Sequence, residues 1–251
     1  MKVFIIAAGM GKRLRPFTVN LPKGLLPIGN DNIIGKQLKI FKNLNIKNIN
    51  LIVGYKKERF SFKKVNYFYN RNYKKNNILN SLFTAKKKLN DKCIISYSDI
   101  IFNNFVVKKL INKNQKEDII IVVDKFWKKN YINRIHHPIL EAEKAFYNSK
   151  HELINVGKGL KLSKTNSEFI GMLKLSKKGC EIFKKYFDLA RKKYGNKKFF
   201  SAKTFEKAYL TDFFKFLLKN KIKIKCLVIN SGWMEIDTTE DLVKAQTFYK
   251  N

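Results

Sequence analysis

A glycine loop beside concentrated positive charge follows the first apolar run of this chain. Gly9 and Gly11 come directly after VFIIAA, and Lys12 and Arg13 follow the second glycine. Glycines bend the backbone without a Cβ penalty and let backbone N–H groups approach phosphate oxygens closely. The loop therefore predicts a bound polyanion, which could be a nucleotide or a nucleic acid.

The spacing of the glycines differs from that of the two common phosphate-binding motifs. No third glycine stands at the dinucleotide spacing, and no GK[ST] follows. The specific feature is a longer string, Gly9-x-Gly11-x-Arg13-Leu14-x-Pro16-x-Thr18, then Pro22-Lys23-x-Leu25-x-Pro27-Ile28. The alternative is a basic loop after a strand that takes no part in any chemistry.

Two distant aspartates end predicted strands. Asp99 closes IISYSD, and Asp237 closes WMEID just before a predicted helix. Carboxylates at the carboxyl ends of strands face the crevice in which open α/β sheets bind ligands, and Mg²⁺ accepts one or two carboxylates along with phosphate oxygens. The alternative for each is a turn former or helix cap, which Thr238 and Asp241 favour for Asp237.

The elements that must position these residues alternate along the chain. Apolar runs predict strands, and helical spacing predicts helices, at the following ranges: strands 3–8, 49–55, 93–99, 118–126, 223–230 and 233–237; helices 33–44, 78–89, 105–111, 176–193, 204–219 and one from Thr239. This order predicts an α/β fold with a three-layer, Rossmann-like, mixed but mainly parallel sheet flanked by helices, and a small antiparallel extension. We expect a single domain over residues 1–251, with about 131–176 forming a substrate-side β insertion.

Composition bounds the partners of the protein. The chain has 251 residues, 45% of them hydrophobic, and a net charge of +34, yet only six of its 53 basic residues are arginine. Arginine is the side chain best suited to bidentate phosphate and base-edge contacts. We therefore favour a lysine-rich compositional bias on solvated faces over a nucleic-acid partner.

Cysteines and apolar stretches bear on the compartment. The three cysteines lie far apart without a CxxC pair, which fits a reducing environment. The apolar stretch at 3–8 is shorter than a signal-peptide core and runs into charge, and no stretch approaches transmembrane length. We expect a cytoplasmic protein without a membrane partner, either a monomer or a homodimer.

The string around the glycine loop closely resembles the signature of nucleotidyltransferases that join a nucleoside triphosphate to a phosphorylated small molecule and release pyrophosphate. These are the sugar-phosphate nucleotidylyltransferases and their phosphocholine cytidylyltransferase relatives. The resemblance extends through Ser98-Asp99 and through Glu235-Ile236-Asp237-Thr238, so it covers essentially the whole chain. It implies a nucleotide-diphospho-sugar transferase-like fold.

The resemblance also implies roles for the matching residues. Arg13 neutralises the departing pyrophosphate, and Lys23 reaches the α-phosphate or the incoming phosphate. Asp99 and Asp237 together hold the catalytic Mg²⁺. The implied nucleotide-binding residues are Ala7, Ala8, Gly9, Gly11, Lys12, Asn77, Ser81 and Ser98.

The helix start Asn76-Asn77-Ile78-Leu79-Asn80-Ser81-Leu82 resembles an Asn-Asn-x-x-Ser-Leu stretch of phosphocholine-type cytidylyltransferases, with the spacing one residue looser. Asparagine and serine supply donors and acceptors that can read a pyrimidine edge, which favours CTP. An ordinary N-cap cluster is the alternative.

The middle of the chain, at 136–144, 157–158 and 168–171, resembles nucleotidyltransferases of phosphonate and phosphoramidate pathways, whose acceptors are small zwitterions such as 2-aminoethylphosphonate or phosphorylated glutamine. For such an acceptor we expect Lys158 to bind the phosphate, Glu168 the ammonium, and Trp233 a cation face. His137 is a further candidate, although it could simply satisfy loop hydrogen bonds.

Two other functions stay open. The first is a sugar-1-phosphate nucleotidylyltransferase using UTP or dTTP, against which the short chain and the Asn/Ser stretch argue. The second is a non-catalytic nucleotide or nucleic-acid binding protein, but binding alone does not require a metal pair. Whether the product enters a capsule polysaccharide, a lipid or a phosphonate pathway is left open.

Overall fold

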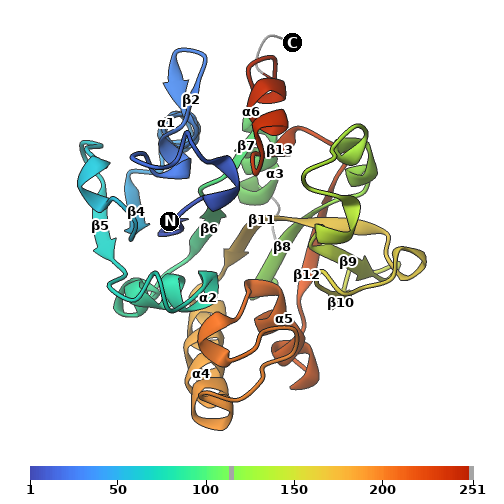
Figure 1. Cartoon of the computed structure of the whole chain (residues 1–251). Coiled ribbons are helices and arrows are strands. Elements are labelled where there is room, and N and C mark those ends of the chain that lie inside the picture. Colours follow the sequence, from blue (N-terminus) through green and yellow to red (C-terminus); the bar gives the residue numbers. More distant parts are fainter. Residues whose placement is uncertain (113–115, 249–251) are drawn as a thin grey trace.

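A mixed sheet forms the centre of the molecule, as the computed structural model of residues 1–112 and 116–248 shows (Figure 1). The strand order among these residues is β10-β9-β11-β6-β1-β4-β5, and β8 lies between β11 and β12. The strands are β1 (Lys2–Ala7), β4 (Asn48–Val53), β5 (Asn66–Tyr69), β6 (Cys93–Tyr97), β8 (Ile119–Asp124), β9 (Lys144–Tyr147), β10 (Leu153–Val156), β11 (Ser167–Leu175) and β12 (Lys225–Ile229).

The pairing directions confirm the predicted α/β class. Strands β6, β1, β4 and β5 run parallel to one another, and β12 runs parallel to β8. Only the strand pairs that involve β11 or β9 are antiparallel within this sheet, as far as the described residues go. The sheet is therefore mixed with a mainly parallel core.

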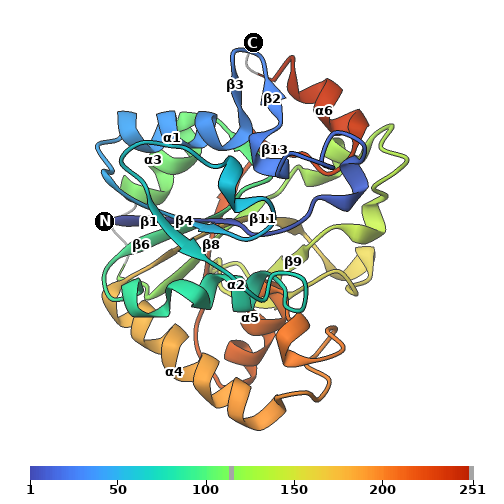
Figure 2. The ribbon, with the colours of Figure 1, turned by 60° about the vertical axis from the view of Figure 1, so that its left-hand side comes forward.

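Helices cover both faces of the sheet, which makes three layers (Figure 2). One face packs on α1 (Ile33–Asn43) and α3 (Asn104–Asn112). The other packs on α2 (Ile78–Leu82), α4 (Lys177–Tyr194) and α5 (Leu210–Lys219). Strand β1 shows why the sheet must be covered twice, because its successive side chains Val3 and Phe4 enter opposite cores and both are buried.

A short ribbon lies outside the main sheet and connects two distant segments. Strand β7 (Ile100–Phe102) pairs antiparallel with β13 (Trp233–Glu235), and the backbone N–H of Ile236 donates to the carbonyl of Asp99 at 2.8 Å. Helix α6 (Thr239–Ala245) begins directly afterwards, with a capping box between Thr238 and Asp241. A hairpin of β2 (Pro27–Ile28) and β3 (Asp31–Asn32) follows the glycine loop.

Three predicted segments differ from the observed elements. The predicted helix at 204–219 is a 3₁₀ helix at Phe205–Lys207 followed by α5, which begins at Leu210. The predicted helix at 78–89 is a short α2 followed by a 3₁₀ helix from Phe83, which contains the non-helical Ala85. Strand β11 lies in the centre of the sheet, where it pairs with both β6 and β8, instead of in an insertion, and all its residues are buried. Only β9 and β10 form the antiparallel extension.

Short 3₁₀ helices join many of these elements. They span Lys12–Leu14, Lys23–Leu25, Lys57–Arg59, Phe83–Lys88, Trp127–Tyr131, Ile139–Glu141, Leu162–Lys164 and Phe205–Lys207.

In the two described ranges, no helix has both the length and the apolar surface needed to cross a bilayer.

Candidate active site

A cleft of about 370 Å³ opens where β1 and β6 end. These strands are parallel neighbours, so their carboxyl ends meet at one edge of the sheet. The cleft brings together most of the predicted site residues, namely Ala7, Ala8, Gly9, Gly11, Lys12, Arg13, Lys23, Asn77, Ser81, Ser98, Asp99, Lys158 and Asp237.

The glycine loop folds back on the segment that carries Lys23. Gly11 has a φ of +58°, and a Cβ there would lie 2.9 Å from Cβ of Lys23. The hydroxyl of Thr18 donates to the carbonyl of Gly11 at 2.8 Å and closes the turn. At Gly9, in contrast, a Cβ would meet nothing within 4 Å, so a ligand can approach the backbone from that side.

Lys23 joins the two predicted aspartates at the base of this loop. Its Nζ donates to Oδ2 of Asp99 at 2.8 Å and also to Oδ1 of Asp237. Arg13 adds a second cation, with Nη2 at 2.6 Å from Oδ2 of Asp237. The β7–β13 ribbon causes this meeting, because Asp99 directly precedes β7 and Asp237 follows β13 by two residues.

The charges in this cluster fix the protonation states. Burial lowers the pKa of Lys23, but the carboxylates of Asp237, Asp99 and Glu235 outweigh it and raise the pKa above its usual value. Burial raises the pKa of Asp237, yet Lys23, His137 and Arg13 hold it well below its ordinary range. Lys23 is therefore a cation and Asp237 an anion at neutral pH.

Glu235 completes the acidic wall of the cleft. Its burial and the charges of Asp237 and Asp99 raise its pKa to about 7. Asp99 has one buried oxygen, Oδ1, that accepts no hydrogen bond from the described residues. An unpaired buried carboxylate oxygen beside a second carboxylate fits a hard divalent cation, and Asp99 and Asp237 are the residues that could hold one.

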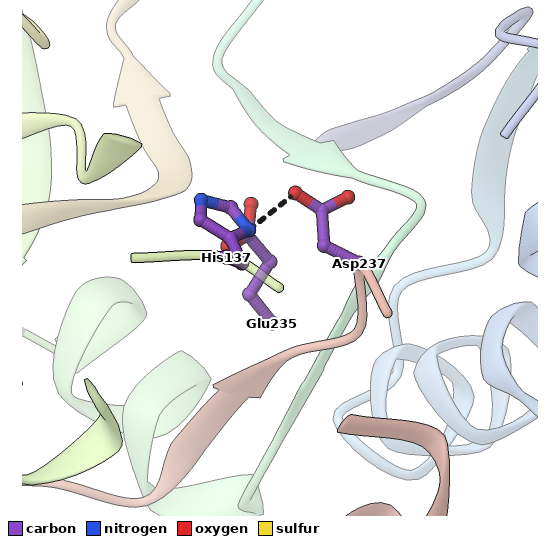
Figure 3. A group of neighbouring side chains, drawn as sticks. All are labelled: His137, Glu235 and Asp237. Carbon is purple, nitrogen blue, oxygen red and sulfur yellow. Dashed lines mark ion pairs between the residues drawn. The ribbon is translucent and has the colours of Figure 1, made fainter. Parts of the chain in front are cut away.

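His137 has a different position from the one predicted (Figure 3). It is 2% exposed and does not line the cleft, and its Nδ1 lies 2.9 Å from Oδ2 of Asp237. Ligand atoms of His137, Glu235 and Asp237 lie within 4.8 Å of one another. His137 thus contacts Asp237 in the interior and does not lie in the lining of the cleft, where the acceptor contact was expected. The neighbouring His136 is exposed beside Glu240.

Glu168 and Trp233 also lie outside the cleft. Glu168 is buried and accepts a hydrogen bond from the hydroxyl of Tyr131. Trp233 is 5% exposed, and its indole Nε1 donates to Oδ2 of Asp124 at 2.9 Å. Both side chains lie in the interior and do not line the cleft in which the acceptor contacts were expected, and Oε2 of Glu168 is buried without a hydrogen-bond partner among the described residues.

The end of the cleft beside Lys158 contains residues that the sequence did not single out. Glu143 accepts hydrogen bonds from the hydroxyls of Tyr97 and Thr211, each at 3.2 Å. Lys158 lies 5.2 Å from the ring centre of Tyr209. Glu143 belongs to the acidic segment LEAEK near His137, which was a usable sequence signal. No sequence signal pointed to Tyr209, which directly precedes α5 and lies far along the chain from Lys158.

A buried ion pair holds the segment that carries Asp237. Arg134 Nη2 donates to Oδ2 of Asp241 at 2.8 Å, and its Nε lies 2.8 Å from Oδ1 of the same carboxylate. That carboxylate also accepts from the backbone N–H groups of Asp237 and Thr238, each at 2.9 Å. Arg134 therefore fixes the start of α6 and the position of Asp237.

Replacing Arg134 with methionine is expected to lower the free energy of unfolding by about 3–5 kcal/mol, because it leaves the buried Asp241 carboxylate without its cation. Urea denaturation of the purified proteins measures the change. The matched control is Arg191→Met, at an exposed arginine of α4, which should change stability by less than about 0.5 kcal/mol. Equal stability of the two variants would contradict the structural role of Arg134.

Known proteins resemble this chain along its length. Residues 3–159 match the MobA-like NTP transferase domain family. The chain is 30% identical over 254 residues to the CTP:phosphoglutamine cytidylyltransferase of Campylobacter jejuni, and this match covers 96% of the chain and 98% of that protein. It is 37% identical over 108 residues to the choline-phosphate cytidylyltransferase of Streptococcus pneumoniae, covering 41% of the chain and 47% of that protein.

A solved structure shares the architecture. The CTP:phosphocholine cytidylyltransferase from Streptococcus pneumoniae superposes with a TM-score of 0.71 at 20% identity, covering 98% of this chain and 97% of that one. At this identity the likeness shows a common fold, which is the mixed sheet with helices on both faces described above.

Proposed function

Because this chain belongs to the MobA-like NTP transferase family and is a nucleotidyltransferase, we propose that it is a Mg²⁺-dependent cytidylyltransferase. It joins CMP from CTP to a small phosphorylated or phosphonylated amine and releases pyrophosphate. One observation carries the proposal: Lys23 bridges Asp99 and Asp237 in a cleft that the adjoining glycine loop also lines.

The geometry suits an in-line transfer at the α-phosphorus of the nucleotide. An oxygen of the acceptor's phosphate or phosphonate attacks that phosphorus, the bond to the bridging oxygen breaks, and pyrophosphate departs. The attacking oxygen is already anionic, so the cleft needs no general base. Catalysis then comes from positioning and from fixed positive charge where negative charge develops.

Two cations are placed for different parts of the nucleotide tail. Lys23 is nearly buried at the base of the glycine loop and suits the α-phosphate. The side chain of Arg13 is 49% exposed at the mouth of the cleft and suits the departing pyrophosphate. A Mg²⁺ ion held by Asp99 and Asp237 would supply further charge stabilisation to the α-phosphoryl group.

We choose CTP and an amine acceptor because of the residues that line the cleft and because of the substrate named for a related protein. Asn77 and Ser81 line the cleft. Asn77 is also the N-cap of α2, where its Oδ1 accepts from the backbone N–H of Ile78 at 2.9 Å and its Nδ2 donates to the carbonyl of Lys207 at 3.1 Å. We therefore expect the hydroxyl of Ser81 to meet the pyrimidine edge. At the other end, Lys158 suits the acceptor's phosphate and Glu143 its ammonium group. The relative from Campylobacter jejuni is described as acting on phosphoglutamine, a phosphorylated amine of this class.

The affinity for an amine acceptor should depend on the ionisation of Glu143. Burial, together with the charge of Glu235, raises the pKa of Glu143 to about 7, although Lys158 and the hydrogen bonds from Thr211 and Tyr97 lower it. The carboxyl group is neutral below this pKa and negative above it, so it attracts an ammonium group only at higher pH. We expect the KM of the acceptor to fall by about tenfold between about pH 6 and pH 8.

Steady-state kinetics at saturating CTP measure this dependence. The control is Glu143→Gln, which keeps the hydrogen-bonding shape without the charge, so its profile reports only the ionisation of the acceptor itself. Identical pH profiles in the two proteins would show that Glu143 does not bind the ammonium group.

An assay of pyrophosphate release tests the whole proposal. The purified protein is incubated with Mg²⁺, one of CTP, UTP or dTTP, and one of phosphoglutamine, 2-aminoethylphosphonate, phosphocholine or glucose-1-phosphate. Release with CTP and an amine supports the proposal. Release only with glucose-1-phosphate and UTP or dTTP would indicate a sugar nucleotidylyltransferase, and no release with any pair would favour a binding protein.

A further inference from the structure

One buried side chain outside the cleft contacts two residues that line it. Asn70 follows β5 and is 3% exposed. Its amide bonds directly to the side chains of Asn76 and Ser81, and both of these residues lie in the wall of the cleft. Asn70 is therefore placed to act on a ligand through its neighbours.

The hydrogen bonds of Asn70 permit only one orientation of its amide. Oδ1 accepts from the backbone N–H of Asn72 at 3.0 Å, and a backbone N–H can only donate. Nδ2 must then face Ser81, whose Oγ it meets at 2.9 Å. Asn76 reinforces this orientation, because the two amides exchange hydrogen bonds of 2.8 and 3.1 Å. Both N–H groups of Asn70 are engaged.

This orientation decides what Ser81 offers to a ligand. The hydroxyl of Ser81 donates its proton to the carbonyl of Asn77 at 3.1 Å, within the first turn of α2. Its oxygen already accepts one hydrogen bond from Asn70, so one lone pair is left. Toward the cleft, Ser81 can therefore accept a hydrogen bond but cannot donate one.

A hydrogen-bond acceptor distinguishes pyrimidine bases. Cytosine carries an exocyclic amino group, which donates, where uracil carries a carbonyl oxygen, which only accepts. An amino group pairs with the free lone pair of Ser81. A carbonyl in the same place would set two acceptors against each other and leave both without a partner, which is costly away from water.

We propose that Asn70 is a positioning residue for base selection: by fixing Ser81 as an acceptor, it favours a triphosphate whose base carries an exocyclic amino group. The inference rests on the proposed function, in that the base of the nucleotide lies beside Ser81. It assigns the preference for CTP over UTP to a residue that touches neither nucleotide.

Equilibrium binding of CTP and of UTP, measured by calorimetry with Mg²⁺ present and no acceptor, tests the inference. In Asn70→Ala the hydroxyl of Ser81 is free to turn and donate, so the ratio of the two dissociation constants should fall by about tenfold. The control is Asn80→Ala. Asn80 lies beside Ser81 on α2, and its amide donates to the carbonyl of Phe205 at 2.9 Å outside the cleft. Its ratio should equal that of the wild type.

A second variant guards against loss of folding. In Asn70→Ser the side chain is smaller than asparagine, but its hydroxyl can still accept from the backbone N–H of Asn72. Thermal unfolding shows whether either Asn70 variant is folded. A folded Asn70 variant that keeps the wild-type ratio would overturn the inference. So would an equal fall in the ratio for Asn80→Ala, which would indicate a general loosening of α2.

The binding measurement separates this inference from the proposed function. If the wild type prefers CTP and the Asn70 variants lose the preference, the inference stands whichever acceptor the turnover assay identifies. If the wild type prefers CTP and the variants keep that preference, only the inference fails. A wild type that binds UTP as tightly as CTP would remove both the inference and the choice of CTP.

Discussion

Replacing Lys23 with methionine is expected to lower kcat by about 10²–10³ while the protein stays folded, because one fixed cation is lost from the place where charge develops in the transition state. Methionine keeps the length of the side chain but not its charge. Nζ of Lys23 contacts both Asp99 and Asp237, so the substitution also removes the cation that these carboxylates share. Divalent cations should therefore bind the variant at least as tightly as the wild type.

Turnover and metal affinity together distinguish this role from a structural one. Pyrophosphate release gives kcat, titration with Mn²⁺ followed by electron paramagnetic resonance gives the metal affinity, and circular dichroism reports folding. The matched control is Lys39→Met. Lys39 is an exposed lysine of α1, and its Nζ lies 2.8 Å from Oδ2 of Asp31. Wild-type turnover in folded Lys23→Met would refute the assignment of Lys23.

Replacing Asp99 or Asp237 with asparagine is expected to lower kcat by about 10³ and to weaken Mg²⁺ binding, because an amide supplies no negative charge to a hard cation. The shapes of the side chains are preserved. The buried Oδ1 of Asp99, which accepts no hydrogen bond from any described residue, is the atom most open to a metal ion. The effect should be partly relieved at high Mg²⁺ concentration.

The dependence of rate on Mg²⁺ concentration measures this effect. Asp188→Asn is the control, since Asp188 forms an exposed ion pair with Lys86 at 2.6 Å, far from the cleft lining. If the Asp99 and Asp237 variants required no more Mg²⁺ than the wild type, the two carboxylates would not be metal ligands. A loss of stability without a change in Mg²⁺ requirement would lead to the same conclusion.

Much of the fold could be predicted from the sequence, because it depends on local patterns. Apolar runs such as Val3–Ala8 specify strands that are covered on both faces, and helical spacing at Ile33–Leu44 specifies the layer above them. The failure at β11 has a physical cause. A strand that is buried along its whole length can lie in a central or an edge position, and only its pairing with β6 and β8 decides which.

The residues around the glycine loop could be predicted from the sequence for a related reason. Gly9 and Gly11 lie in one short loop, and Asp99 follows the end of the parallel strand β6 by two residues, so local order and strand direction place them at one edge of the sheet. Asp237 lies beside these residues because β13 pairs with β7. Its position after a predicted strand was nevertheless enough to predict it as a site residue.

The residues that line the acceptor end of the cleft, and the hydrogen bond from Asn70 to Ser81, could be identified only from the tertiary structure. Glu168 and Trp233 have the chemistry of acceptor-binding residues, but packing turns both side chains into the interior, where Glu168 accepts from Tyr131 and Trp233 donates to Asp124. Glu143 reaches the cleft instead. The sequence alone thus determined which elements form and which residues gather where β1 and β6 end. Which polar side chains face the cleft was decided by contacts between remote segments, because a side chain's direction and burial depend on neighbours that no local pattern specifies.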